Sequence, residues 1–416
     1  MNKSRLAKRL QQQIEYFSGK LCGGMSKPVG RSVCEMIYGI QARQSVRLSE
    51  VARSLNEEIR LIKTENRLSR QLGRSGLKDA LCKSLIEEGK GKIGKETLLI
   101  VDISDIAKKY AEKMEYMARV RDGSDGVISD GYWLCDIIGV ERGGKEIVPL
   151  YQELYSQDAP GFASENKEIE KGIVKVTKAI GGKGVWVIDR GGDRRKIYDF
   201  LLDNELRFLV RLVGNRHLFY RGRKVLASEL VHRCKYRYAE RIVKENSNTE
   251  KAYTIEYGFV KVKLPKSEEK LYMVIVKGFG EEPMLLLTNV GLKKSRKSLW
   301  QIVESYITRW TIEETIRYMK QSYGLEDVRV LRYGSLRNLM VIVMATMYFA
   351  CVYLGQRPKL QILAMYVLRS AKRLFGIPDF RYYALADGIR SILYPYAGRK
   401  TRPFTYKSPR YQLSLF

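Results

Sequence analysis

Four polar residues near the end of this sequence could do chemistry on a phosphate group if their segment is helical. At about 100° per residue, a helix gathers them within an arc of roughly 60°: Tyr306, Arg309, Glu313 and Lys320. That face would carry a carboxylate, two cations and a phenol that can donate a hydrogen bond to an oxyanion. An ordinary amphipathic helix with solvated charges has the same pattern, so its meaning depends on acids elsewhere in the chain.

We predict a single helix over about 296–323 to hold these residues, with a buried face beside the polar one. Ile312, Ile316 and Met319 would form that buried face.

Two further acids stand at the ends of apolar runs. Residues 97–102 and 184–189 are short, β-branched stretches that end in Asp102 and Asp189. Buried strands of this kind deliver carboxylates to one edge of a sheet. For a single strand-end Asp, a helix N-cap or a turn is an equally good interpretation. Asp105 and Asp193 fit that structural role best, because each is predicted to follow a strand and precede a helix.

The residue types available favour a magnesium or manganese site. The chain has only two histidines, and its six cysteines are scattered without a CxxC pair, which indicates neither zinc nor a disulfide framework and fits a reducing compartment. Any metal site would be built from carboxylates, the ligands of hard divalent cations. Asp102, Asp189 and Glu313 could together hold two Mg²⁺ or Mn²⁺ ions for an in-line displacement at phosphorus.

The overall charge indicates an extended polyanionic partner. Lys and Arg number 75 against 46 Asp and Glu, a formal net charge of +29 spread along the 416 residues. Nucleic acid is the first candidate. An anionic membrane surface is the second, but it would need an amphipathic helix with a lipid-facing side, and we find none.

No segment predicts export or membrane insertion. The basic N-terminus has no apolar core behind it, so it is not a secretory signal. The longest apolar run, 339–354, has 16 residues, fewer than the roughly 20 of a membrane span, and predicts a buried helix. We expect a soluble, cytoplasmic protein.

The pattern of apolar residues divides the chain into five parts. Residues 1–92 are basic and have helical spacing, as in Leu48, Val51, Leu55, Ile59 and Ile62, which fits a helix-turn-helix DNA-binding region but also many basic helical bundles. The other parts are 93–214, the first half of an α/β core; 215–293, an insertion of strand-like runs; 294–355, the second half of the core; and 356–416, a basic C-terminal region.

The order of these features resembles a known family. The chain has, in order, a strand with Asp102, a strand with Asp189, a strand-rich insertion and a helix with Glu313. This order is similar to that of the RNase H-like core of bacterial insertion-sequence DDE transposases. The spacing of Tyr306, Arg309, Glu313 and Lys320 resembles the Tyr-Arg-Glu-Lys signature of the subgroup that carries a β-strand insertion. The segment 188–194 is similar to that subgroup's second-Asp motif. Family members often have a second Asp directly after the first, where this chain has Ile103.

The resemblance, which covers about 40–355, implies a fold and a set of roles. The fold would be an α/β, RNase H-like mixed sheet flanked by helices, with the β-rich insertion before the last catalytic helix. Asp102, Asp189 and Glu313 would be catalytic and bind two Mg²⁺ or Mn²⁺ ions. Residues near the scissile bond would bind DNA: Tyr306, Arg309, Lys320, Arg190 and Arg194. The partners would be double-stranded DNA at the element's ends and target, and a second copy of the chain in a synaptic homodimer, in the nucleoid of a bacterial cytoplasm.

The last five residues form a separate motif. Gln412, Leu413, Leu415 and Phe416 resemble the peptide by which bacterial replication and repair proteins dock on the DNA polymerase sliding clamp. A tail folded back on its own domain is the alternative.

Two function classes remain. The first is a transposase that binds terminal inverted repeats and performs Mg²⁺-dependent cleavage and strand transfer. The alternative is a catalytically silent, transposase-derived DNA-binding protein, which would have no need of three metal ligands. Trp300 and Trp310 lie near the predicted site, and core packing is the expected role for both.

Overall fold

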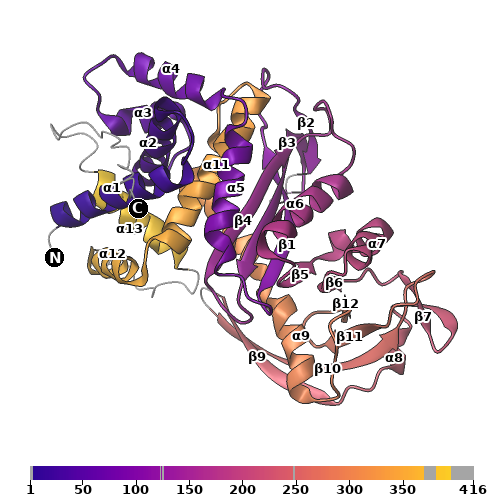
Figure 1. Cartoon of the computed structure of the whole chain (residues 1–416). Coiled ribbons are helices and arrows are strands. Elements are labelled where there is room, and N and C mark those ends of the chain that lie inside the picture. Colours follow the sequence, from indigo (N-terminus) through magenta and orange to yellow (C-terminus); the bar gives the residue numbers. More distant parts are fainter. Residues whose placement is uncertain (1–2, 122, 124–125, 247–248, 370–380, 395–416) are drawn as a thin grey trace, which may run out of the picture.

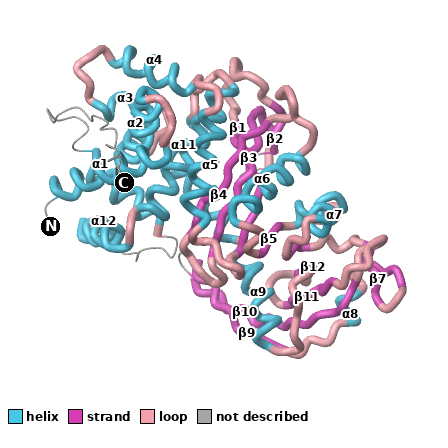
Figure 2. Tube along the Cα trace, viewed as in Figure 1, coloured by secondary structure: helices cyan, strands magenta, loops and turns pink. Residues whose placement is uncertain are grey.

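The computed structural model describes residues 3–121, 123, 126–246, 249–369 and 381–394. The helical end of the molecule is at the left of Figure 1 and the strand-rich end at the lower right. Figure 2 separates the same two ends by secondary structure. The described helices are α1 (Lys3–Leu21), α2 (Lys27–Arg43), α3 (Leu48–Leu55), α4 (Leu61–Leu72), α5 (Leu77–Lys90), α6 (Glu165–Ile180), α7 (Arg195–Asp203), α8 (Leu230–Arg233), α9 (Arg296–Thr308), α10 (Trp310–Tyr323), α11 (Tyr333–Tyr348), α12 (Gln356–Arg369) and α13 (Tyr382–Leu393).

One mixed sheet runs through the molecule. Its described strands, with the small β7–β8 hairpin outside it, are β1 (Leu98–Ala107), β2 (Ala118–Arg121), β3 (Ile128–Val140), β4 (Ile147–Tyr155), β5 (Val185–Ile188), β6 (Phe208–Arg211), β7 (His217–Tyr220), β8 (Arg223–Leu226), β9 (Tyr238–Asn246), β10 (Thr249–Val262), β11 (Leu271–Lys277) and β12 (Met284–Thr288). The strands of the core lie in the order β4-β3-β1-β5-β6. Strand β3 is antiparallel to both β4 and β1, whereas β5 is parallel to β1 and β6 is parallel to β5. The predicted fold class, an RNase H-like mixed sheet flanked by helices, is confirmed.

The predicted strand-rich insertion continues this sheet. Strand β12 pairs with β6, and β11, β10 and β9 follow in order, all antiparallel. Four of the five strand-like runs predicted between 215 and 293 correspond to β9, β10, β11 and β12. The fifth, 219–226, is part of the β7–β8 hairpin, with its turn at Arg221, whose φ is 51°.

The long apolar segment forms the central buried helix of the helical end. Tyr333–Tyr353 is long and apolar enough to cross a membrane, but 89% of its most apolar window is buried inside the fold. Helix α11 packs against β4, α5 and α2, and a π-helical turn, η3 (Phe349–Tyr353), follows it. It is therefore a core helix, as its length predicted.

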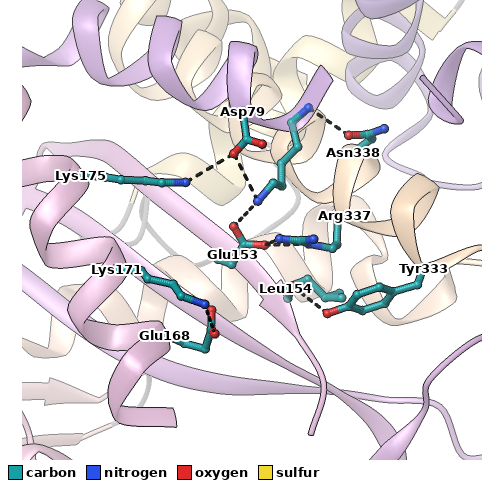
Figure 3. A network of polar contacts seen from close by, with 10 residues as sticks. Asp79, Glu153, Leu154, Glu168, Lys171, Lys175, Tyr333, Arg337 and Asn338 are labelled. Carbon is teal, nitrogen blue, oxygen red and sulfur yellow. Dashed lines mark hydrogen bonds and ion pairs between the residues drawn. The ribbon is translucent and has the colours of Figure 1, made fainter. Parts of the chain in front are cut away.

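A buried glutamate joins the N-terminal helices to the sheet. Glu153, on β4, is 3% exposed and accepts Lys78 Nζ from α5 at 2.5 Å and Arg337 Nε from α11 at 2.8 Å (Figure 3). Asn338 on α11 adds a second contact to Lys78, because its Oδ1 accepts the backbone N–H of Lys78 at 2.9 Å. Residues 1–92 therefore pack on the catalytic core through charged as well as apolar contacts.

Two predicted element boundaries are wrong. The first strand runs on to Ala107, so Asp102 lies in the middle of β1 and not at its end, because the apolar, β-branched pattern continues through Ile103 and Ile106. The predicted 296–323 helix is interrupted at Arg309. The helical spacing over 48–62 is divided between α3 and α4, since Asn56 takes a left-handed conformation with φ 49° and separates them. The described residues do not include 412–416, so the clamp-like peptide lies outside them.

Candidate active site

Sheet register brings the two aspartates together. Strands β1 and β5 are parallel, with Val101 opposite Ile188, so Asp102 and Asp189 follow as neighbours on adjacent strands. Neighbouring strands lie about 4.8 Å apart, which puts the two carboxylates within reach of one ion. Asp189 leads into the short 3-10 turn η1 (Arg190–Gly192), and its Oδ1 accepts the N–H of Gly191 at 2.7 Å. Asp189 therefore begins a turn and also lies beside Asp102.

Arg309 links the third acid to the first. Its guanidinium pairs with the Glu313 carboxylate one turn along α10 and lies 3.9 Å from Asp102 Oδ2. Arg309 is 5% exposed, whereas the Glu313 side chain is 46% exposed. The arginine therefore sits at the bottom of the site and the glutamate at its mouth.

The helix break at Arg309 changes how the polar face is built. Its N–H bonds to Tyr306 O at 3.1 Å, and the N–H of Ile312 bonds to Arg309 O at 3.1 Å, spacings that are tighter than in an α-helix. The residue ends α9 and precedes α10, so the four signature residues come from two helices. They still share one region, but the single 60° arc expected from ideal geometry is wrong.

The pKa of Asp102 reflects the crowding of negative charge. Burial, together with the charges of Asp189 and Glu313, raises the pKa of Asp102 from 3.8 to about 7, and Arg309 opposes this rise. A cluster of oxygen ligands with too few cations fits a divalent metal ion. Across the described residues, however, no three His, Cys, Asp or Glu side chains form a ready-made metal cluster. Glu313 faces Arg309, and it would have to turn from that partner to join the aspartates.

A fourth acid lies behind Asp102 and was not predicted. Asp136 on β3 is directly opposite Asp102 in the register, is 3% exposed, and accepts Gln152 Nε2 at 2.8 Å. Burial raises its pKa to about 7, against the opposing effects of Gln152 and Lys320. Only the pairing of β1 with β3 reveals this neighbour, since nothing in the spacing of the sequence marks it.

Tyr306 is held between two arginines. It is 3% exposed, and the guanidinium carbons of Arg309 and Arg211 lie 5.6 and 5.9 Å from the centre of its ring. Burial raises the pKa of Tyr306, although both cations oppose this, so the phenol stays a neutral hydrogen-bond donor. Arg211, at the end of β6, was not predicted.

Lys320 is tied to carboxylates in this structure. Its Nζ lies 3.3 Å from Asp105 Oδ2 and 2.8 Å from Glu326 Oε1. Burial acts to lower the pKa of Lys320, but Glu326 and Asp105 outweigh it and raise the pKa. The prediction that Asp105 lies between a strand and a helix is wrong. It is a buried residue of β1 that accepts the N–H of Gly123 at 3.0 Å.

The arginines of the second-Asp motif differ in their partners. Arg190 is exposed beside Asp189. Arg194 pairs with Glu165 at 2.5 Å and donates to Asn166 Oδ1 at 2.9 Å, which ties it to the start of α6. Asp193 accepts Arg216 Nε and the N–H of Val213, both at 2.7 Å. These contacts give Asp193 a structural role, as predicted, but the N-cap position of α7 belongs to Arg194.

The two tryptophans near the site pack against other rings, as predicted. Trp300 lies 6.1 Å from Tyr257 and Trp310 lies 5.2 Å from Phe279, measured between ring centres. Trp310 also lines a small cavity of about 60 Å³ with Arg211 and Tyr306.

Comparison with protein families agrees with this geometry. Residues 154–349 match the model of the transposase DDE domain, and that segment includes Asp189 and Glu313. This stretch of the chain is therefore similar to a transposase DDE domain. Asp102 lies before the matched segment, and the β1–β5 pairing brings it beside Asp189. No curated protein matches the chain. Among solved structures, the piggyBac transposase synaptic complex with hairpin DNA is similar, with 11% identity, a TM-score of 0.45, and coverage of 95% of this chain and 81% of that one.

Proposed function

We propose that the chain is the DNA transposase of an insertion sequence, belonging to the bacterial subgroup with a β-strand insertion and the Tyr-Arg-Glu-Lys signature. It binds terminal inverted repeats and cleaves and joins DNA in a cut-and-paste reaction that depends on two Mg²⁺ or Mn²⁺ ions. The observation that carries the proposal is that Asp102 and Asp189 lie on neighbouring strands while Arg309 links Asp102 to Glu313, in a chain that matches the DDE domain.

The three acids are proposed to hold the ions. When bound, the ions would activate the attacking oxygen and stabilise the leaving oxygen at phosphorus. Without the ions, Arg309 partly neutralises the negative charge of the acids. Once the carboxylates take up metal, its guanidinium becomes available to clamp a phosphate in bidentate fashion. Arg190, exposed beside Asp189, is placed to contact the same DNA strand.

End recognition is assigned to α3 and α4. The two helices are joined by the turn at Asn56, an arrangement found in helix-turn-helix proteins. The buried Glu35 of α2 pairs with Arg67 at 2.5 Å and so fixes α4 against the bundle. Helix α4 also exposes Lys63 and Asn66. Asn can read adenine through two hydrogen bonds, and Lys can contact phosphate or guanine.

Separate substitutions test chemistry and recognition. Asp102→Ala, Asp189→Ala and Glu313→Ala should each remove Mg²⁺-dependent cleavage of an end-containing duplex and keep end binding. Lys63→Ala with Asn66→Ala should weaken binding to the end more than to an unrelated duplex. Asp199→Ala is the control, because this acid is on the surface of α7 and pairs only with Arg195 among the described residues.

Near-normal cleavage by any of the three acid variants would show that the assignment is wrong. The DNA beside the gene gives an independent check. Imperfect inverted repeats bounded by a short direct duplication are expected there.

Two partners complete the proposal. A homodimer would pair the two ends in the synaptic complex, and mass measurement of the protein with end DNA should give two chains and two duplexes. Gln412, Leu413, Leu415 and Phe416 would bind the sliding clamp. Deleting 412–416 should abolish clamp capture in a pull-down and leave cleavage intact, and unchanged capture would refute the clamp assignment.

A further inference from the structure

We propose that a basic groove in the strand-rich insertion binds the phosphate backbone of duplex DNA at a place separate from the three acids. The insertion groove is a cavity of about 680 Å³. Its lining includes no carboxylate and has six cations: Arg221, Arg233, Lys235, Arg237, Lys261 and Lys294. The proposal rests on the proposed function, because it takes DNA as the substrate.

Close crossing of two segments builds the groove. The chain after α8 passes over β10 at Gly258, where an added Cβ would lie 2.3 Å from the carbonyl oxygen of Lys235. On the other side, the β7–β8 hairpin is joined to the end of β10 by two backbone hydrogen bonds between Phe219 and Lys263, of 2.8 and 3.0 Å. The backbone that carries the cations is therefore fixed on both sides of the groove.

The positive charge of the groove is almost uncompensated. Arg233 lies 3.8 Å from Glu229, and the other five cations have no carboxylate within ion-pair distance among the described residues. Arg296, outside the groove, is by contrast paired with Glu240 at 2.8 Å. Like charges gathered in a concave surface repel one another and attract counter-ions. A polyanion entering the groove would relieve that repulsion.

The shape of the charged surface favours an extended ligand over a single small anion. A second cavity, of about 530 Å³, shares Arg221 and Lys261 with the groove and adds Lys266 and Lys270. The cations therefore continue as a track across two adjoining hollows. Such a track matches a strand of phosphates, each carrying one charge.

Helix α9 relates the groove to the active site. Leu299, near its start, lines the groove, and Tyr306, near its end, packs against Arg309, which pairs with Glu313. Ten residues from Leu299 to Arg309 span about 15 Å at 1.5 Å per residue. That is roughly half of the 34 Å turn of B-DNA. A duplex reaching the acids can thus present backbone to the groove, whether it is the element's own end or the target.

The test uses the whole protein and a matched pair of charge reversals. Lys235→Glu with Lys261→Glu changes two exposed groove residues, and Lys178→Glu with Lys183→Glu changes two exposed residues at the end of α6. Binding to an end duplex and to an unrelated duplex is measured in EDTA at several salt concentrations. Cleavage of the end duplex by the wild type in Mg²⁺ is measured separately.

The groove variant should bind at least tenfold more weakly, and its log-log salt slope should fall by about 2, because each lost phosphate contact lowers the slope by roughly 0.9. The α6 variant should stay within about twofold of the wild type. Loss on the end duplex alone identifies the element's end as the ligand, and equal loss on the unrelated duplex identifies target or flanking DNA. Arginine at both groove positions should restore the wild-type slope.

An unchanged slope on both duplexes, or an equal loss in the α6 variant, would overturn the proposal. The proposal would also be overturned if the groove variant bound RNA or polyglutamate more weakly than the wild type but bound DNA equally well. If the wild type fails to cleave in Mg²⁺ while the groove variant lowers the slope, the proposed function fails and the groove stands. If the wild type cleaves and the slope is unchanged, the groove alone fails.

Discussion

At the scale of single residues, the site is a set of carboxylates held close together by one arginine. Asp102 shows the consequence most clearly, because burial and the charges of Asp189 and Glu313 raise its pKa to about 7. Its ionised form is therefore disfavoured in the metal-free fold. The acid is stabilised either by a proton or by a bound cation, and the two compete.

Asp102→Asn should make the metal-free protein more stable, and increasingly so as the pH rises. A raised carboxyl pKa means that the wild type loses stability from the ordinary value of 3.8 up to about 7, while the amide does not titrate. Between pH 5 and 8 the advantage of the variant should grow by about 2 to 3 kcal/mol. Urea unfolding in EDTA at both pH values measures it, with Asp199→Asn as the surface control. A gap that is constant or shrinks with pH would contradict the proposed cause.

The parts of the proposed site could be identified from sequence to different degrees. Asp102, Asp189 and Glu313 could be identified because each type and position matches a spaced pattern. The partners that tune them could not. Asp136 and Arg211 reach the site only through the pairing of β1 with β3 and the position of β6. The sequence also gave no sign that Arg309 would be buried between two acids, since an arginine on a polar helix face is ordinarily solvated.

At the scale of elements, the sheet brings the site together and the helices fix the DNA-facing parts to it. Glu153 is the main polar contact between β4, α5 and α11 (Figure 3). Because it pairs with two cations from a buried position, removing it leaves Arg337 without its carboxylate partner and Lys78 with Asp79 alone, at 3.5 Å.

Glu153→Ala should therefore destabilise the protein by about 3 to 5 kcal/mol and loosen α5 and α11 together. Glu87→Ala, also on α5, is the control, because its pair with Lys90 is exposed and should contribute less than about 1 kcal/mol. Urea unfolding gives the free energies, and hydrogen exchange shows which helices lose protection. Equal effects of the two substitutions would mean that the buried network does not join these elements.

Element prediction succeeded where apolar spacing was regular and failed where a single residue set the boundary. The apolar spacing predicts a helix over 165–180 and strands over 132–140 and 146–154, and α6, β3 and β4 match these ranges within a few residues. The division between α3 and α4 depends on the left-handed backbone of Asn56, and the one between α9 and α10 on tight turns at Arg309. No glycine or proline marks either break, so local propensity alone could not place them.

At the scale of the whole molecule, one sheet spans the catalytic core and the insertion. The order from β4 to β9 makes the insertion an extension of the core, so α9 and the signature residues are anchored to both. The excess of 75 basic over 46 acidic residues lies on a framework in which the N-terminal helices α2 and α5 pack on α11 and the C-terminal helix α13 packs on α2. A long DNA molecule can therefore be contacted at the N-terminal helices, the acids and the insertion groove.

The central claim is that three acids from distant parts of the chain form one metal site. Iron-directed cleavage tests it most directly, because Fe²⁺ bound in place of Mg²⁺ generates radicals that cut the nearby backbone when ascorbate and peroxide are added. We predict cuts beside Asp102, Asp189 and Glu313 in the full-length protein, suppressed by excess Mg²⁺ and absent from Asp189→Ala. Cuts confined to one of these segments, or cuts elsewhere that Mg²⁺ does not suppress, would contradict the account.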